Sequence, residues 1–234
     1  AVHDIIVKLL VNISTYPEYI CYIRSNALYE LVRDMMESSN GCFAVPCLYS
    51  VLNIVSHCES SLSAEEVCSL IQLCDQTLNQ TDDVIEIRLA LELLAKAAEL
   101  CRGGKDQTEF ININITSGLY TVRFVWQDDL DCRRYVAHVL ALLARRSGYT
   151  NQVSISEIEL IMTMILQKDL LQNELLDHKV AHDCMSVIIS YVERSHASVA
   201  DVLGLSSWKC LVENLFHKDN EDFDLPINIR LSAL

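Results

Sequence analysis

The sequence predicts an all-α fold, a right-handed solenoid of stacked helical repeats. Residues 4–14 and 46–57 both place apolar residues at helical spacing and contain the pair Asn-Ile, with Asn12 and Asn53 41 positions apart. A recurrence of about 40 to 47 residues is typical of repeats built from two or three helices. The composition agrees, because 51% of the 234 residues are hydrophobic and only six glycines and three prolines are available for the turns of a many-stranded fold.

Three helices are predicted in the N-terminal part of the chain. In residues 2–14 the apolar side chains recur every three or four positions, which is the spacing of a buried helical stripe. Pro17 ends this helix, since proline disfavours helical geometry in the residue before it. A short helix follows over residues 18–24, and a longer amphipathic helix over residues 26–37 ends at a Ser-Ser-Asn-Gly run.

The same order of elements then recurs. Residues 47–56 repeat the first helix, and residues 65–79 repeat the longer amphipathic helix. A helix over residues 84–101 follows an acidic Thr-Asp-Asp start, where carboxylates satisfy free backbone amides and the positive end of the helix dipole. In this helix Leu93 takes the place of Asn53, 40 positions later.

The second half of the chain is predicted to continue the pattern after a break at residues 102–105, Arg-Gly-Gly-Lys. Residues 110–115 alternate apolar and polar side chains as a strand does. We expect a short helix there, because nothing nearby offers a strand partner. Leu142 then takes the repeat position, 49 after Leu93. One helix is expected from residue 118, and after an acidic loop a second one that contains Leu142. Further helices are expected over residues 156–168, 179–194, 207–217 and 226–234.

The order of these elements resembles the armadillo repeat. Its third helix carries an LxNL-like signature, matched here by Leu10-Val11-Asn12-Ile13, and a short first helix and a second helix opening at Ser25-Asn26-Ala27-Leu28 follow. The resemblance covers essentially the whole chain and implies one solenoid of about five armadillo-like repeats over residues 1–234. The chain then begins inside a third helix, so we expect it to be an excerpt of a longer protein.

The resemblance also implies a binding site along the third helices. In armadillo proteins the asparagines of this ladder hydrogen-bond the backbone of a bound extended peptide, because an amide supplies both a donor and an acceptor. The matching positions are Asn12 and Asn53, with Lys8 and Tyr49 one turn earlier. The equivalent later positions are Leu89, Leu93, His138 and Leu142.

A second interpretation of these positions needs no partner. Asn12 and Asn53 would bridge neighbouring loops, and the leucines would belong to the hydrophobic core. If the ladder is a site, its polar first half and apolar second half suit an amphipathic helix or a short motif with two or three apolar anchors.

Charge and motifs exclude several functions. The net charge of −14 disfavours a nucleic-acid or membrane-surface binder, because phosphate neutralisation needs clustered Lys and Arg, and a basic protein partner fits better. The sequence contains no GxGxxG, GxxxxGK[ST] or GxSxG motif, so we expect no enzyme and no cofactor. His178 and His182 share a helix face, but HKVAH lacks the glutamate of HExxH, so no metal site is predicted.

The ten cysteines indicate a reducing compartment. No two form a CxxC pair, and most lie inside apolar helical patterns, where cysteine behaves as a small buried hydrophobe. Reduced thiols, with no signal peptide and no long apolar run, predict the cytoplasm or the nucleus. The thiols expected in the core are Cys21, Cys47, Cys68, Cys74, Cys132, Cys184 and Cys210.

The function expected from these observations is that of a non-enzymatic scaffold holding a partner peptide or helix along a groove. Two alternatives remain open. The apolar end of a solenoid could stack on a second copy to form a homodimer, or the chain could be a regulatory domain of a larger enzyme. A fold alone does not decide among them.

Overall fold

The computed structural model of the chain describes residues 2–38, 42–57, 62–100, 129–144, 155, 158–159, 162, 176–193 and 196–209. Within these ranges every regular element is a helix, which confirms the predicted all-α class. The chain divides into two compact units, Ala1–Tyr135 and Val136–Leu234. The expectation of one solenoid over residues 1–234 stays a prediction.

The helices of the first unit match the predicted ones closely. The largest difference is at α4, which begins three residues before the predicted start, because proline is tolerated in the first turn of a helix and Pro46 therefore does not delay it. The helices described are α1 (Val2–Ser14), α2 (Pro17–Ile23), α3 (Asn26–Ser38), α4 (Ala44–Ser56), α5 (Ala64–Gln80) and α6 (Val84–Leu100).

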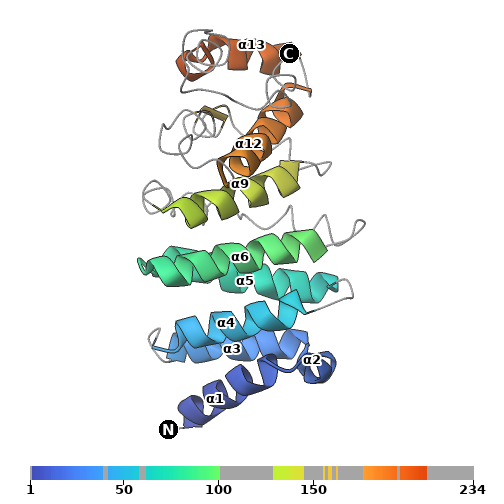
Figure 1. The fold of residues 1–234 in the computed structure, drawn as a ribbon, viewed down its shortest axis with the longest axis vertical. Helices are drawn as coiled ribbons and strands as arrows, with labels where there is room; N and C mark the ends of the chain where they lie inside the picture. Colours follow the sequence, from blue (N-terminus) through green and yellow to red (C-terminus); the bar gives the residue numbers. More distant parts are fainter. Residues whose placement is uncertain are drawn as a thin grey trace. The chain divides into compact units, whose positions relative to one another are not determined.

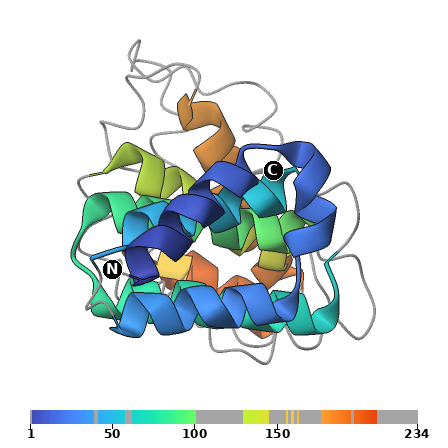
Figure 2. The ribbon, with the colours of Figure 1, turned by 90° about the horizontal axis from the view of Figure 1, so that it is seen from below.

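These helices lie in two layers (Figures 1 and 2). One layer contains α1, α4 and α6, in which α1 contacts α4 and α4 contacts α6, and the second contains α3 and α5. Contacts of α3 with α4 and of α5 with α6 join the layers. Burying each large apolar side chain between them stabilises the unit by about 1.5–3 kcal/mol. The fully buried side chains come from both layers and include Leu48, Ile54, Leu70, Ile71, Leu91 and Leu93.

Polar contacts between helices of the first unit join residues about 40 positions apart. Arg33 donates to Gln72 at 3.0 Å, and Gln76 donates to Glu37 at 2.9 Å, so both bonds join α3 to α5 across 39 positions. Arg24, just after α2, pairs with Glu66 of α5 across 42 positions. The first unit is therefore held by polar contacts between residues 39 to 42 positions apart as well as by its core.

Glu66 links the start of α5 to the end of α2. Its carboxylate accepts hydrogen bonds from Arg24 Nε at 2.6 Å and Arg24 Nη2 at 2.7 Å. It also accepts from the backbone of Ser63, whose hydroxyl accepts in turn from the Glu66 amide, which makes a capping box. Burial alone would raise the pKa of Glu66, but the bonds from Arg24 and Ser63 outweigh it and lower the pKa below its usual value.

The boundary between the units falls inside α9 (Leu130–Ala144), and the second unit contains its residues from Val136 onward. The second unit also contains α12 (Leu176–Val192) and α13 (His196–Gly204), and these two helices contact each other. The helices α9 and α12 confirm predicted ones. Ser207 donates to the sulfur of buried Met162 at 3.6 Å, across 45 positions. The predicted helix at residues 110–115, the one from residue 118 and the one at 226–234 lie outside the described residues, as do most of those at 156–168 and 207–217.

Candidate functional site

Helix α4 presents one accessible stripe. Tyr49 is 48% exposed and Asn53 is half-buried, and the other accessible residues of the helix, Val45, Pro46 and Ser56, follow the same face. The rest of α4 is buried where it contacts α1, α3 and α6. Two of the predicted ladder residues therefore lie one helical turn apart on the face of α4 that the described part of the chain leaves accessible.

Helix α1 carries the matching positions 41 residues earlier, and both are exposed. Lys8 forms an exposed ion pair with Asp4 at 2.9 Å, a type of contact that contributes little to stability. The Asn12 side chain is also at the surface. Within the described part of the chain, neither Asn12 nor Asn53 uses its side-chain amide in a hydrogen bond. Both amides are thus available to an incoming backbone.

In α6 the accessible stripe lies one residue before the position expected from the sequence. Leu93 is completely buried, so its side chain belongs to the core and cannot reach a partner, while Leu89 is half-buried at the edge of the stripe. Glu92 is the accessible residue 39 positions after Asn53. The sequence does contain a signal for the accessible side of this helix, because charged residues recur every four positions in an otherwise apolar segment. These residues are Arg88, Glu92 and Lys96.

Arg88 is held by carboxylates at the start of α9, about 40 residues later in the chain. Its Nε donates to Asp129 at 3.0 Å, its Nη2 binds the second oxygen of the same carboxylate, and Asp131 lies 3.6 Å away. The hydrogen bond from Arg88 lowers the pKa of Asp129 to about 2 against the opposing effect of burial, and the Cys132 amide adds a further bond. Asp129 thereby caps the start of α9.

Tyr135 belongs to the same neighbourhood. Burial, followed by the negative charge of Glu92 and a hydrogen bond to it, raises the pKa of Tyr135 to about 12. The tyrosine therefore stays neutral at physiological pH. Arg88 and Glu92, which the sequence reasoning did not nominate, thus both connect α6 to residues near the start of α9.

The last two predicted site residues lie in the second unit. The His138 ring nitrogen Nδ1 is 3.1 Å from the nearly buried Asp183 carboxylate of α12, and Leu142 is half-buried. His182 lies 3.7 Å from the same carboxylate. No group of three His, Cys, Asp or Glu side chains that could hold a metal ion occurs among the described residues.

The thiols divide into buried and accessible ones. Cys47, Cys74, Cys132 and Cys184 are buried, as predicted, and burial raises the pKa of Cys47 to about 11 and that of Cys132 to about 12. Such thiols are poor nucleophiles because little thiolate forms. The expectation for Cys21 was wrong: it lies on the exposed side of the short helix α2. Cys68 is half-buried, and Cys210 lies outside the described residues.

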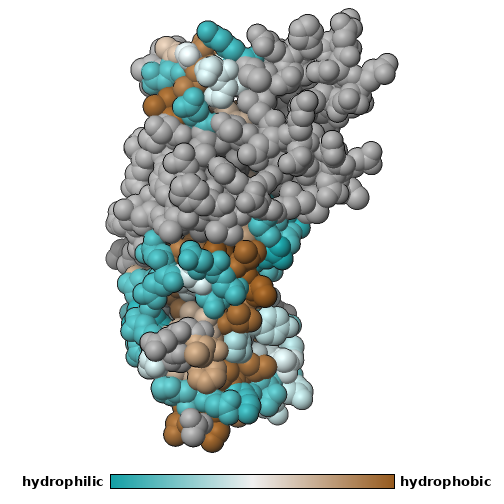
Figure 3. All heavy atoms as spheres, turned by 90° about the vertical axis from the view of Figure 1, so that its left-hand side faces the viewer, coloured by the Kyte–Doolittle hydropathy of each residue, from teal (hydrophilic) through white to brown (hydrophobic). Residues whose placement is uncertain are grey.

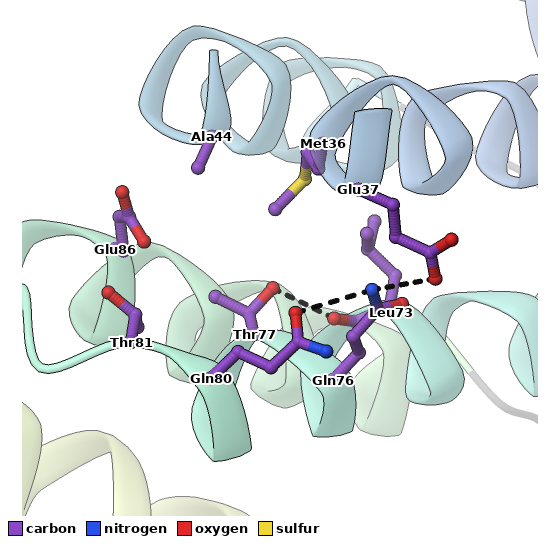
Figure 4. Close-up of a pocket in the computed structure, with 9 residues that line it drawn as sticks. All are labelled: Met36, Glu37, Ala44, Leu73, Gln76, Thr77, Gln80, Thr81 and Glu86. Atoms are coloured by element: carbon purple, nitrogen blue, oxygen red, sulfur yellow. Dashed lines mark hydrogen bonds between the residues drawn. The ribbon is translucent and has the colours of Figure 1, made fainter. Parts of the chain in front are cut away.

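A cleft of about 410 Å³ opens at one end of the first unit, where α3 and α5 end and α4 and α6 begin (Figure 4). Its volume is within the range of about 300–1,000 Å³ of ligand pockets. The lining combines apolar groups with two carboxylates, and it could not be predicted from the sequence because its residues come from the ends of four helices. They are Met36, Glu37, Ala44, Leu73, Gln76, Thr77, Gln80, Thr81 and Glu86.

The outer face of α1 exposes an apolar stripe formed by Val2, Ile5 and Leu9, which are 56–68% exposed. Hydrophobic residues, coloured brown, lie at the lower tip of the surface in Figure 3, at the height where Figure 1 places α1. The α4 residue 41 positions after Leu9 is Ser50, which is fully buried. The position that is buried in α4, at Ser50, is therefore exposed to solvent in α1, at Leu9.

The comparisons add no relative to this picture. The sequence matches no protein-family model, and the searches of curated proteins and of solved structures find no match. Within the described residues, no helix has both the length and the apolar character needed to cross a membrane. The armadillo resemblance rests on the repeat spacing and the order of the helices.

Proposed function

We propose that the chain is a non-enzymatic scaffold, a right-handed solenoid of about five armadillo-like repeats that binds a partner peptide or amphipathic helix. The partner lies across the accessible stripes of α1 and α4, where the amides of Asn12 and Asn53 hydrogen-bond its backbone and the Tyr49 ring packs against one of its apolar side chains. Tyrosine suits this role because it offers a large apolar area at a small cost in conformational entropy.

The observation that carries this proposal is the pairing of exposed positions at the repeat spacing. Lys8 and Asn12 on α1 and Tyr49 and Asn53 on α4 are accessible at matching places, while the residues around them in α4 are buried. A side-chain amide that has no partner among the described residues can bind a ligand without breaking an internal hydrogen bond, because it exchanges only bonds to water. Glu92 continues this row on α6.

A double variant, Tyr49→Ala/Asn53→Ala, tests the site in a quantitative pull-down from cell extract. We expect partners retained by the native chain to be reduced about tenfold or more, as for the loss of a central interface residue. The matched control is Tyr22→Ala/Asn79→Ala, which removes the same two residue types from exposed positions of α2 and α5. If both variants lose the partner equally, or if both retain it, the binding site lies elsewhere.

Self-association is a second candidate function, and the apolar stripe of α1 favours it. Two copies could bury Val2, Ile5 and Leu9 against each other in an isologous contact. The prediction is that the native chain sediments as a dimer and that Leu9→Asp sediments as a monomer with unchanged helicity, because the new charge would be desolvated in the contact. A native chain that remains monomeric at high micromolar concentration would refute this candidate.

A further inference from the structure

The cleft between the ends of α3, α4, α5 and α6 is electrostatically one-sided. Glu37 and Glu86 are the charged residues of its lining, and none of the nine lining residues is basic. The C-terminal ends of α3 and α5 and the N-terminal ends of α4 and α6 meet there, so the partial charges of the helix ends offset one another. The negative potential of the cleft therefore comes from the two carboxylates.

Both carboxylates have unused hydrogen-bonding capacity. Oε1 of Glu37 accepts from Gln76 Nε2 at 2.9 Å, which fixes the side chain in place (Figure 4), while its Oε2 accepts from no described residue. The Glu86 carboxylate forms no hydrogen bond or ion pair within the described part of the chain. In Figure 4 the two lie at opposite ends of the cleft, with the glutamines and threonines between them.

The remaining lining suits an aliphatic chain that ends in a cation. Ala44 and Leu73 are buried, and together with Met36 they offer apolar surface to a methylene stem. The Thr77 hydroxyl donates to the Leu73 carbonyl at 2.9 Å, so its oxygen is left to accept. The Gln80 amide oxygen accepts from Gln76 Nε2 at 3.4 Å and has a second lone pair, so it adds an acceptor beside the carboxylates. Lysine and arginine have this division between an apolar stem and a charged head.

We propose that this cleft binds a lysine or arginine side chain of a basic segment in a partner protein. The inference deepens the proposed scaffold function, because it states the charge of the partner and gives it a second anchoring point away from Tyr49 and Asn53. Charge complementarity supports it locally through Glu37 and Glu86, and the net charge of −14 favours the approach of a basic partner.

The probe for this site is the peptide acetyl-Gly-Arg-Gly-amide, titrated into the labelled protein while the side-chain amide signals of Gln76 and Gln80 are followed by NMR. We expect saturable shifts of these signals, and an affinity about tenfold or more weaker for Glu37→Gln/Glu86→Gln, since charge-assisted hydrogen bonds are the strong ones. The neutral citrulline analogue of the peptide should leave the signals in place. The matched charge control is Glu18→Gln/Glu65→Gln, at exposed positions outside the lining.

Three results would overturn the proposal. The first is equal affinity of Glu37→Gln/Glu86→Gln and of the control Glu18→Gln/Glu65→Gln for the arginine peptide, which would mean that binding depends only on the overall charge of the protein. The second is equal binding of the citrulline peptide. The third is binding of free spermidine without binding of the arginine peptide. The Tyr49→Ala/Asn53→Ala variant should keep full affinity for the probe, so failure of the cleft and failure of the ladder site are distinguishable.

Discussion

Replacing Arg24 by Ala should lower the free energy of unfolding by about 3–5 kcal/mol at pH 7, as removal of one partner of a buried ion pair does. The Arg24 and Glu66 side chains are only 13% and 11% exposed, and two short hydrogen bonds join them. Without the guanidinium, the Glu66 carboxylate stays buried with Ser63 as its remaining partner among the contacts described above. Urea unfolding followed by circular dichroism measures the loss.

The pH dependence separates this cause from simple loss of packing. Because the folded pKa of Glu66 is lowered, its contribution is fully present above the unfolded pKa and disappears as the pH falls through the folded pKa. The difference between the native chain and Arg24→Ala should therefore shrink as the pH falls, because the buried carboxyl group of the variant has lost the lowering effect of Arg24 and takes up its proton at a higher pH than in the native chain. A double variant, Arg24→Met/Glu66→Leu, should be far less damaging than Arg24→Ala. A difference that is constant with pH would contradict the electrostatic explanation.

Replacing Leu93 by Ala should cost about 2–5 kcal/mol of stability, through the loss of buried apolar area and the cavity left behind. Leu93 is fully buried in α6, and this helix packs against both α4 and α5, so the surroundings have little freedom to collapse into the gap. Thermal and urea unfolding of the purified variant would show the decrease in stability. At low temperature, where the variant is still folded, it should still bind the partner that Tyr49→Ala/Asn53→Ala loses.

Leu31→Ala is the control for this core variant, because Leu31 is 45% exposed on α3 and its truncation should cost much less. If Leu93→Ala unfolds like the native chain but loses the partner, then Leu93 reaches the partner after a rearrangement. That outcome would restore the position to the ladder where the sequence pattern placed it.

The sequence was sufficient to predict the helices of the first unit, because their apolar residues recur at helical spacing and Pro17 and the acidic start at residues 81–83 mark the boundaries. Most of the buried cysteines were predictable for the same reason. The repeat spacing also identified Tyr49 and Asn53 as neighbours on one face. These features depend on local periodicity, which a single sequence carries in full.

The features that could not be predicted depend on how separate helices meet. In α6 the sequence pattern placed the expected ladder position at Leu93, which is buried, whereas the accessible residue is Glu92; an apolar helix with several leucines fits both registers almost equally well. The Arg24–Glu66 pair joins residues 42 positions apart, and the cleft takes its lining from four helices. Neither the ion pair nor the cleft can be recognised from the local pattern of apolar and polar residues in the sequence.

The regular separation of the polar partners has a consequence for how the chain folds. The pairs that join neighbouring helices of the first unit close segments of 39 to 42 residues. Closure entropy depends only on the logarithm of loop length, so no pair is much harder to form than another. In the proposed solenoid, folding can then begin at any adjacent set of helices and grow outwards. Once Gln80 has left the ribosome, every residue of the α3–α5 contacts is present, and helices α1 to α5 can assemble while the rest of the chain is still being synthesised.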